Sequence, residues 1–166
     1  METKQIYLRE LTLEDVSEKY LSWLNDPEVN EHLGLTKDKA ITSKLTLDDL
    51  KEFVFKKWDN NSCYFMGIFL KETDEHIGNI KLEYMTINGE QTWGIGLLIG
   101  EKQYWNKGIG TEAVRLMLDI AFTDKIPEVI LAVKEENKGA IRVYEKVGFK
   151  QYDKLLYYKI KKEDLK

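Results

Sequence analysis

A glycine-containing stretch in the second half of the chain has the composition of an anion site. Two glycines, Gly108 and Gly110, stand where a loop would enter a helix. Backbone amides at a helix start point at one spot, the helix dipole adds partial positive charge there, and glycine leaves room for a phosphate. We therefore predict that an anion is held by the stretch Asn106, Lys107, Gly108, Ile109, Gly110 and Thr111.

Two other interpretations of these glycines stay open at this point. They suit a tight strand-to-helix turn without a ligand, in which Lys107 is an ordinary exposed lysine. They also match the dinucleotide pattern Gly-x-Gly-x-x-Ala, and Glu135 follows shortly after the next expected strand. Too few residues follow the loop for the usual paired nucleotide-binding halves, and no Gly-x-x-x-x-Gly-Lys-Ser/Thr run occurs.

The elements around this stretch follow from the spacing of apolar residues and from capping residues. Asn137 can cap a helix whose apolar stripe includes Tyr144, and Gly148 ends it as a left-handed residue. The residue before Pro27 ends an earlier helix. We expect strands over residues 5–11, 63–70, 76–84, 92–99, 129–133 and 149–161, and helices over residues 12–25, from Pro27, from Thr46, over 109–122 and over 137–148.

This order predicts one domain over residues 1–166, an α/β (α+β) fold with a mixed, largely antiparallel sheet and helices on both faces. A formal net charge of -4 argues against a general nucleic-acid binder. Cys63 is the only cysteine, so no intrachain disulfide can form, and its apolar run predicts a buried structural thiol. No signal peptide or membrane-spanning run is present, so a cytoplasmic protein without membrane contact is expected.

Two runs carry a resemblance to a known family: YWNKGIGTEAVRLML and, after it, ENKGAIRVYEKVGF. They resemble the coenzyme-binding core of the GNAT acetyltransferase superfamily. The opening LRELTLEDVSEKYLSWLNDPEV resembles the branch with ribosomal-protein N-terminal acetyltransferases, which is similar to bacterial enzymes acetylating nucleotide-linked sugars and antibiotics. The resemblance implies acetyl-CoA as cosubstrate, no metal, and direct transfer of the acetyl group to a primary amine.

The resemblance also implies roles for single residues. Leu98, Ile99 and Gly100 match the splayed strand that holds the acetyl carbonyl and the pantetheine arm, and residues 106–111 match the pyrophosphate loop. Asn137 matches a residue that contacts the coenzyme, beside its role as a helix cap. Tyr144 matches the tyrosine that protonates the leaving sulfur, whereas the apolar stripe alone suggests a core aromatic.

The sequence departs from the family pattern at three positions. Trp105 replaces the Arg or Gln that begins the loop in many members, although Trp is common in this branch. Gly94 and Ala132 occupy the strand positions where related enzymes carry a carboxylate base. Glu83 is the candidate in their place, because alternation puts it on one strand face with Lys81 and Asn79; it could equally be a solvated carboxylate. Glu101, His32 and His76 are further titratable side chains nearby.

We expect the acceptor to be a small or nucleotide-linked amine ahead of a protein N-terminus, because the missing carboxylates favour an amine of low pKa. Trp23, Trp58, His32 and residues 31–44 could form one wall of the acceptor cleft; the other interpretation is that both tryptophans simply belong to the core. The alternatives are a module that binds acetyl-CoA without chemistry and a dinucleotide-binding domain. The sequence does not determine the oligomeric state, and a homodimer stays open.

Overall fold

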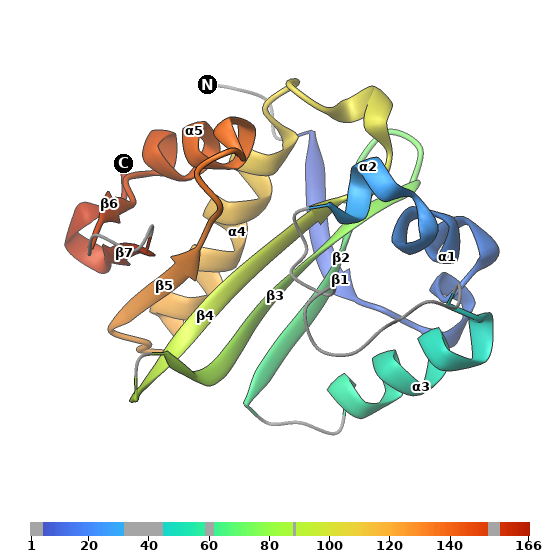
Figure 1. The fold of residues 1–166 in the computed structure, drawn as a ribbon, viewed down its shortest axis with the longest axis horizontal. Coiled ribbons are helices and arrows are strands. Elements are labelled where there is room, and N and C mark those ends of the chain that lie inside the picture. Colours follow the sequence, from blue (N-terminus) through green and yellow to red (C-terminus); the bar gives the residue numbers. More distant parts are fainter. Residues whose placement is uncertain (1–4, 32–44, 59–61, 88, 153–156) are drawn as a thin grey trace.

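A computed structural model describes residues 5–31, 45–58, 62–87, 89–152 and 157–166. Within these residues a single sheet runs through the molecule with the strand order β1-β2-β3-β4-β5-β7-β6 (Figure 1). Every pairing is antiparallel except that of β4 with β5. The predicted mixed, largely antiparallel sheet is confirmed. Its strands are β1 (Ile6–Glu10), β2 (Cys63–Leu70), β3 (His76–Ile87), β4 (Glu90–Ile99), β5 (Glu128–Ala132), β6 (Lys150–Gln151) and β7 (Tyr157–Lys161).

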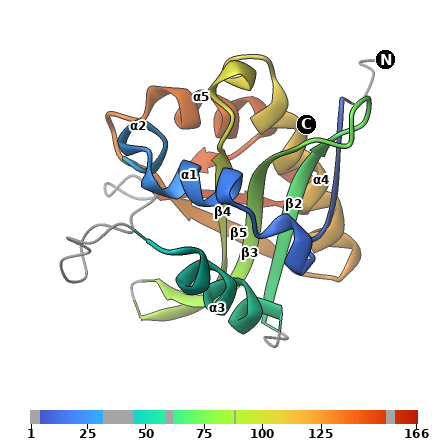
Figure 2. The same cartoon turned by 90° about the vertical axis from the view of Figure 1, so that its right-hand side faces the viewer.

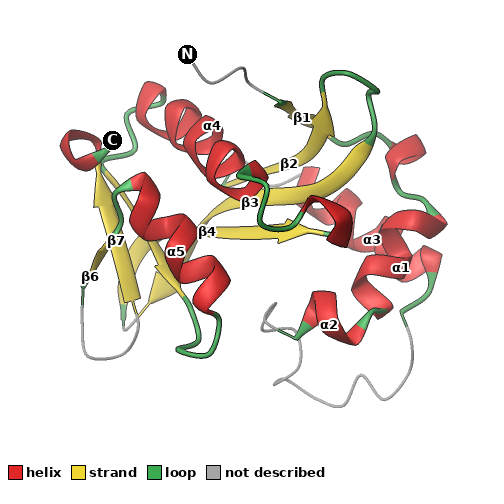
Figure 3. Ribbon diagram, turned by 90° about the horizontal axis from the view of Figure 1, so that it is seen from above, coloured by secondary structure: helices red, strands yellow, loops and turns green. Residues whose placement is uncertain are grey.

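Helices cover both faces of the sheet, as predicted (Figures 1 and 2). One face carries α1 (Glu18–Asn25), α2 (Pro27–Asn30) and α3 (Leu47–Trp58), and the other carries α4 (Ile109–Thr123) and α5 (Lys138–Val147). Seen from above, the two groups lie on opposite sides of β3 and β4 (Figure 3). We name these surfaces the α1/α3 face and the α4/α5 face.

Alternation along the strands divides the core between these faces. On β3, Ile80 and Leu82 are fully buried in the cluster that contains Met117 and Leu118 of α4. Phe69 of β2 belongs instead to the second cluster, with side chains of α1 and α3. Burying one such side chain stabilises the fold by about 1.5–3 kcal/mol. The two clusters therefore hold the helix layers firmly against the sheet between them.

Some expected element boundaries differ from the structure for local reasons. The helix expected over residues 12–25 is broken, because Asp15 accepts hydrogen bonds from the N–H and hydroxyl of Thr12 and closes a short 3-10 turn. A new helix then starts after Ser17, whose hydroxyl accepts the Tyr20 N–H at 3.3 Å. β3 and β4 are longer than expected and meet at a hairpin in which Gly89 has a φ of +82°.

The last strand is also different, because residues 149–161 form two antiparallel strands, β6 and β7, instead of one. His32 and residues 32–44, expected to line an acceptor cleft, lie outside the described residues, as does the side chain of Trp58. Trp23 is only 4% exposed and belongs to the core on the α1/α3 face, in agreement with the core interpretation of this residue.

Candidate active site

The predicted anion stretch forms a loop that ends in the first turn of α4. Asn106 and Gly108 have left-handed φ values of +59° and +84°. The first helical hydrogen bond runs from the Glu112 N–H to the Gly108 carbonyl at 3.0 Å. The amides of Ile109 and Gly110 precede it and have no acceptor among the described residues, so they point outward from the helix end. This geometry suits an anion, and the binding of one here stays a prediction.

Gly110 lies where this helix end meets its neighbours. A Cβ built on Gly110 would come within 3.2 Å of Leu97 Cδ2 on β4 and 3.5 Å of Val143 Cγ2 on α5. A larger residue would push the helix end away from both walls. The second loop glycine is therefore required by packing, whereas Gly108 is required by its left-handed backbone.

The strand that leads into the loop is held by backbone and indole hydrogen bonds. The Gly100 N–H donates to the Ile77 carbonyl on β3 at 2.9 Å, and the Trp105 indole donates to the Ile99 carbonyl at 2.8 Å. A Cβ on Gly100 would overlap the ring of Trp23, whose own indole donates to Glu101 at 2.9 Å. The end of β4 is thus fixed from both sides.

β4 and β5 share only one pair of partner residues, Gly94 and Ile130. Along an antiparallel strand, the backbone N–H and C=O groups of successive residues face opposite neighbours. The Gly100 N–H bonds to β3, so the N–H and C=O of Leu98 also face β3, whereas those of Leu97 and Ile99 face away from it. Residues 97–99 stay half-buried although β4 lies inside the sheet. Beyond Gly94, the Leu97 backbone and the Ile99 N–H therefore lack a strand partner on the β5 side of β4. We call this stretch the opening beside β4.

The three residues predicted to contact the coenzyme from β4 differ in the direction of their backbone polar groups. Of Leu98, Ile99 and Gly100, only Ile99 turns its backbone amide into it, since the polar backbone groups of the other two face β3. Leu97 joins Ile99 there and was missed. Strict alternation along β4 is the signal that could have identified it.

α5 supplies the predicted Tyr144 and Asn137. The Asn137 side chain accepts the Ala140 N–H at 3.0 Å, which confirms the helix cap. Tyr144 is 6% exposed and packs edge-on against Phe149, and its hydroxyl has no hydrogen-bond partner among the described residues. Burial raises the pKa of Tyr144 to about 12, so the phenol keeps its proton at neutral pH. Its hydroxyl is thus free to donate a hydrogen bond.

Glu83 lies on the α1/α3 face directly across from Gly94. Its carboxylate accepts hydrogen bonds from Lys57 of α3 and from Lys81, the latter at 3.0 Å. Burial alone would raise its pKa, but the two lysine hydrogen bonds outweigh burial and hold the pKa of Glu83 below its usual value. A carboxylate therefore occupies the neighbourhood of the position that Gly94 leaves bare.

The other titratable candidates are engaged elsewhere. Glu101 accepts from Trp23 and lies 3.5 Å from Lys19. The His76 ring stacks on Phe69, and burial lowers its pKa. Cys63, expected to be buried, is half-buried, and burial raises the pKa of its thiol.

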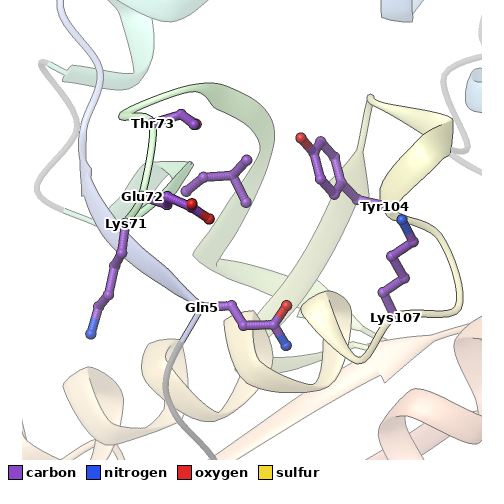
Figure 4. A pocket seen from close by; sticks show the side chains of 7 residues that line it. Gln5, Lys71, Glu72, Thr73, Tyr104 and Lys107 are labelled. Atoms are coloured by element: carbon purple, nitrogen blue, oxygen red, sulfur yellow. The ribbon is translucent and has the colours of Figure 1, made fainter.

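A cavity of about 440 Å³ lies beside the loop (Figure 4). The side chain of Lys107 lines this cavity together with Tyr104, and its ammonium lies 5.7 Å from the centre of the Tyr104 ring. The remaining lining residues come from the start of β1 and the turn between β2 and β3: Gln5, Leu70, Lys71, Glu72 and Thr73.

The described part of the chain holds neither a cluster of metal-binding side chains nor a membrane-spanning helix. There, no three or more His, Cys, Asp or Glu side chains gather in a way that could hold a metal ion. None of the described helices combines the length and the apolar character needed to cross a membrane.

Comparison with known proteins identifies the architecture. A family model described as "Acetyltransferase (GNAT) domain" matches residues 5–150. The "Probable N-acetyltransferase YjcK" of Bacillus subtilis (strain 168) is 31% identical over 148 residues, covering 88% of this chain and 81% of its own.

Two solved structures share the fold. Spermidine N-acetyltransferase from Vibrio cholerae, in complex with CoA and spermine, has a TM-score of 0.78 at 18% identity and is covered over 98% of both chains. Aminoglycoside acetyltransferase AAC(6')-Ib, in complex with coenzyme A and kanamycin, has a TM-score of 0.76 at 23% identity and 96% coverage of both.

A sheet that loses its β4–β5 pairing beyond Gly94, beside a helix whose first amides are free, is an arrangement that can take a ligand with a phosphate group. With the family model matching most of its length, the chain belongs to the GNAT acetyltransferase family, which uses acetyl-CoA as cosubstrate. The free amides at the start of α4 suit the phosphates of that molecule, and the Leu97 backbone and the Ile99 N–H suit its amide-containing arm.

Proposed function

We propose that this chain transfers an acetyl group to the primary amine of a small or nucleotide-linked acceptor, by direct attack of the amine. One observation carries the proposal most strongly. The Leu97 backbone and the Ile99 N–H lack a strand partner on the β5 side of β4, and the free amides of α4 begin only a short loop further along the chain, tied to β4 by the Trp105–Ile99 hydrogen bond. A ligand with phosphates at one end and peptide-like amides at the other is complementary to this arrangement.

Acetyl-CoA supplies a thioester carbonyl that an amine can attack. The amides of Gly108, Ile109 and Gly110 bind its pyrophosphate, and Asn137 contacts it from the start of α5. The Ile99 N–H donates to the carbonyl oxygen as negative charge develops there. Tyr144 donates its phenolic proton toward the sulfur that leaves.

Glu83 removes the proton that the acceptor amine must lose. An alkyl ammonium with a pKa of about 10.4 is almost fully protonated at neutral pH, so a base or water chain is needed. Glu83 is ionised there because Lys57 and Lys81 lower its pKa. Its position across from Gly94 allows transfer through a water molecule. A carboxylate of low pKa is a weak base, which favours an amine of low intrinsic pKa.

The experiment is an acetyl-CoA turnover assay, read by thiol release, against amino sugars, nucleotide-linked amino sugars, polyamines, aminoglycosides and N-terminal peptides. Turnover of a sugar or nucleotide-linked amine above the peptides supports the proposal. Turnover of peptides alone would assign the chain to protein N-terminal acetylation. A melting-temperature increase with acetyl-CoA but no turnover of any amine would indicate a binding module, and an increase with NAD alone would overturn the coenzyme assignment.

A further inference from the structure

We propose that the acceptor carries an anionic group, a phosphate or a carboxylate, near its amine, and that Lys57 and Lys81 bind this group. The inference rests on the proposed function and names the acceptor class of the same site. It follows from the cluster of Lys57, Lys81 and Glu83, which we call the lysine pair with its carboxylate.

Two elements build this cluster on the α1/α3 face. α3 contributes Lys57, and β3 contributes Lys81 and Glu83, two residues apart on the same strand face. Two ammonium groups and one carboxylate leave a net charge of +1. No other carboxylate among the described residues lies within ion-pair distance of either lysine. The positive charge is therefore available to a ligand.

The cluster borders the opening beside β4. A Cβ on Gly96 would lie 3.3 Å from Lys81 Cε, so the stem of Lys81 runs across β4. The Lys81 side chain is 40% exposed, while those of Lys57 and Glu83 are each 17% exposed. Each ammonium has three N–H donors and uses one on Glu83, so the remaining donors of Lys81 reach solvent at the open side.

One neighbouring charged pair on this face is already neutral. Gly94 is the partner of Ile130 on β5, and Ile130 is the partner of Lys159 on β7, so Lys159 lies on the same face of the sheet as Gly94. Its ammonium is paired with Glu128 at 2.9 Å. Lys159 and Glu128 together therefore leave the local charge of the lysine pair with its carboxylate at +1.

This charge separates acceptor classes. A phosphate or carboxylate gains charge-assisted hydrogen bonds from the free lysine donors. A polycation, such as a polyamine or an aminoglycoside, brings like charge toward the same ammonium groups and is rejected. The acceptor class therefore differs from those bound in the spermidine and aminoglycoside acetyltransferase structures, although the fold is shared.

The test compares amines that differ only in the anionic group. 3-Aminopropyl phosphate is paired with 3-aminopropanol, and 4-aminobutyrate with putrescine, so the two arms distinguish phosphate from carboxylate. We expect a higher kcat/KM, by at least about tenfold, for the anionic member of one or both pairs. Equal values in both pairs, or preference for putrescine, would overturn the inference.

Lysine variants assign the preference to the cluster. Lys57→Met and Lys81→Met should each reduce the anion preference while keeping the response of melting temperature to acetyl-CoA. Lys56→Met is the matched control, because Lys56 is exposed on α3 and pairs only with Glu52. An anion preference that persists in both Lys57→Met and Lys81→Met would refute the assignment even if the enzyme is active.

Cys63 gives a readout that does not depend on turnover. It is the only cysteine of the chain and lies directly across from Glu83 on the neighbouring strand. 3-Aminopropyl phosphate, added with CoA, should slow alkylation of Cys63 measured by mass spectrometry, and 3-aminopropanol should not. Lys57→Met should remove this protection. Equal rates of Cys63 alkylation with both compounds would contradict the inference. If instead 3-aminopropyl phosphate slows the alkylation but no amine is acetylated, the inference stands and the proposed function fails.

Discussion

The indole N–H of Trp105 donates to the carbonyl of Ile99 at 2.8 Å and so ties the coenzyme loop to the end of β4. This carbonyl turns away from β3, so the indole satisfies a group that the sheet leaves unpaired. The hydrogen bond fixes the loop relative to the strand amide proposed to contact the thioester.

Trp105→Phe removes only this hydrogen bond while keeping an aromatic ring. We expect the free energy of unfolding to fall by about 1 kcal/mol, and coenzyme affinity to fall as well because the loop loses its attachment. Denaturant titration and calorimetry measure the two quantities. Trp93→Phe is the control, because Trp93 packs on Tyr64 and Tyr84 and its indole has no acceptor among the described residues. Equal coenzyme affinities in both variants would show that the bond does not orient the loop.

Gly108→Ala and Gly89→Ala form a matched pair. The glycines have similar left-handed φ values, +84° and +82°, and a Cβ at either position would have no neighbour within 4 Å. Each alanine should lower stability by about 1–2 kcal/mol through left-handed strain. Only Gly108→Ala should also weaken the thermal shift caused by acetyl-CoA, because its methyl group stands where the phosphate approaches. If acetyl-CoA shifts the melting temperature of Gly108→Ala as much as that of the wild type, the loop is a structural turn and does not bind the coenzyme.

Tyr144→Phe should lower turnover by roughly 10²-fold or more while leaving coenzyme binding intact. The hydroxyl has no hydrogen-bond partner among the described residues, so stability should change by less than about 0.5 kcal/mol. Since the pKa of Tyr144 is about 12, the phenol should remain a donor throughout the neutral range and should not cause a loss of activity there. If kcat is unchanged under conditions in which the chemical step limits the rate, Tyr144 has only a structural role in the core.

Glu83→Gln should reduce turnover by about 10²-fold to 10⁴-fold with acetyl-CoA binding preserved. Because the folded-state pKa of Glu83 is lowered, its stabilising contribution is present above the unfolded carboxyl pKa and is lost as the pH falls through the folded value. The stability difference between wild type and Glu83→Gln should therefore shrink in acid. Glu90→Gln, an exposed change at the start of β4, is the control for pH-dependent melting. A constant difference at all pH values would exclude this linkage.

Gly100→Ala should destabilise the protein, by about 1–3 kcal/mol, because the new methyl group overlaps the Trp23 ring. Gly96→Ala lies on the same strand face, but its methyl group meets only the flexible stem of Lys81. It should cost less. Trp23→Leu should make room and reduce the cost of Gly100→Ala, which a double-mutant cycle measures. Additive effects of the two changes would mean that the strand end shifts to avoid the ring.

Local chemistry made the loop before α4 and the two ends of α5 predictable from sequence. The loop glycines, the Asn137 cap and the end of α5 at Gly148 depend on neighbours close in the chain, and each is present. Alternation also put Lys81 and Glu83 on one face correctly. The sequence predicted a mixed, largely antiparallel sheet but not the order of its strands. That β7 lies between β5 and β6 depends on contacts that form only when the whole sheet packs.

Long-range contacts explain what the sequence did not predict. Lys57 reaches Glu83 only because α3 packs across β2, and no pattern within α3 predicts that partner. The break before α1 arises because the Asp15 carboxylate binds Arg9 as well as Thr12. For Trp23 the sequence left a cleft wall and the core both open, because only the fold shows that the glycine at position 100 creates the space that takes its ring.

The position of β1 at the edge of the sheet has a consequence for how the chain folds. β1 pairs with β2 from Ile6 opposite Leu70 to Glu10 opposite Met66. The chain between these two strands contains α1, α2 and α3, so their pairing closes a long loop. β2, β3 and β4 pair through short hairpins and can form early, whereas closing a long loop is slow. The Glu112 carboxylate of α4 accepts the Gln5 and Ile6 amides at 3.1 and 3.2 Å. β1 should therefore dock late, onto a helix already in place, and its amides should exchange with solvent before those of the central hairpins.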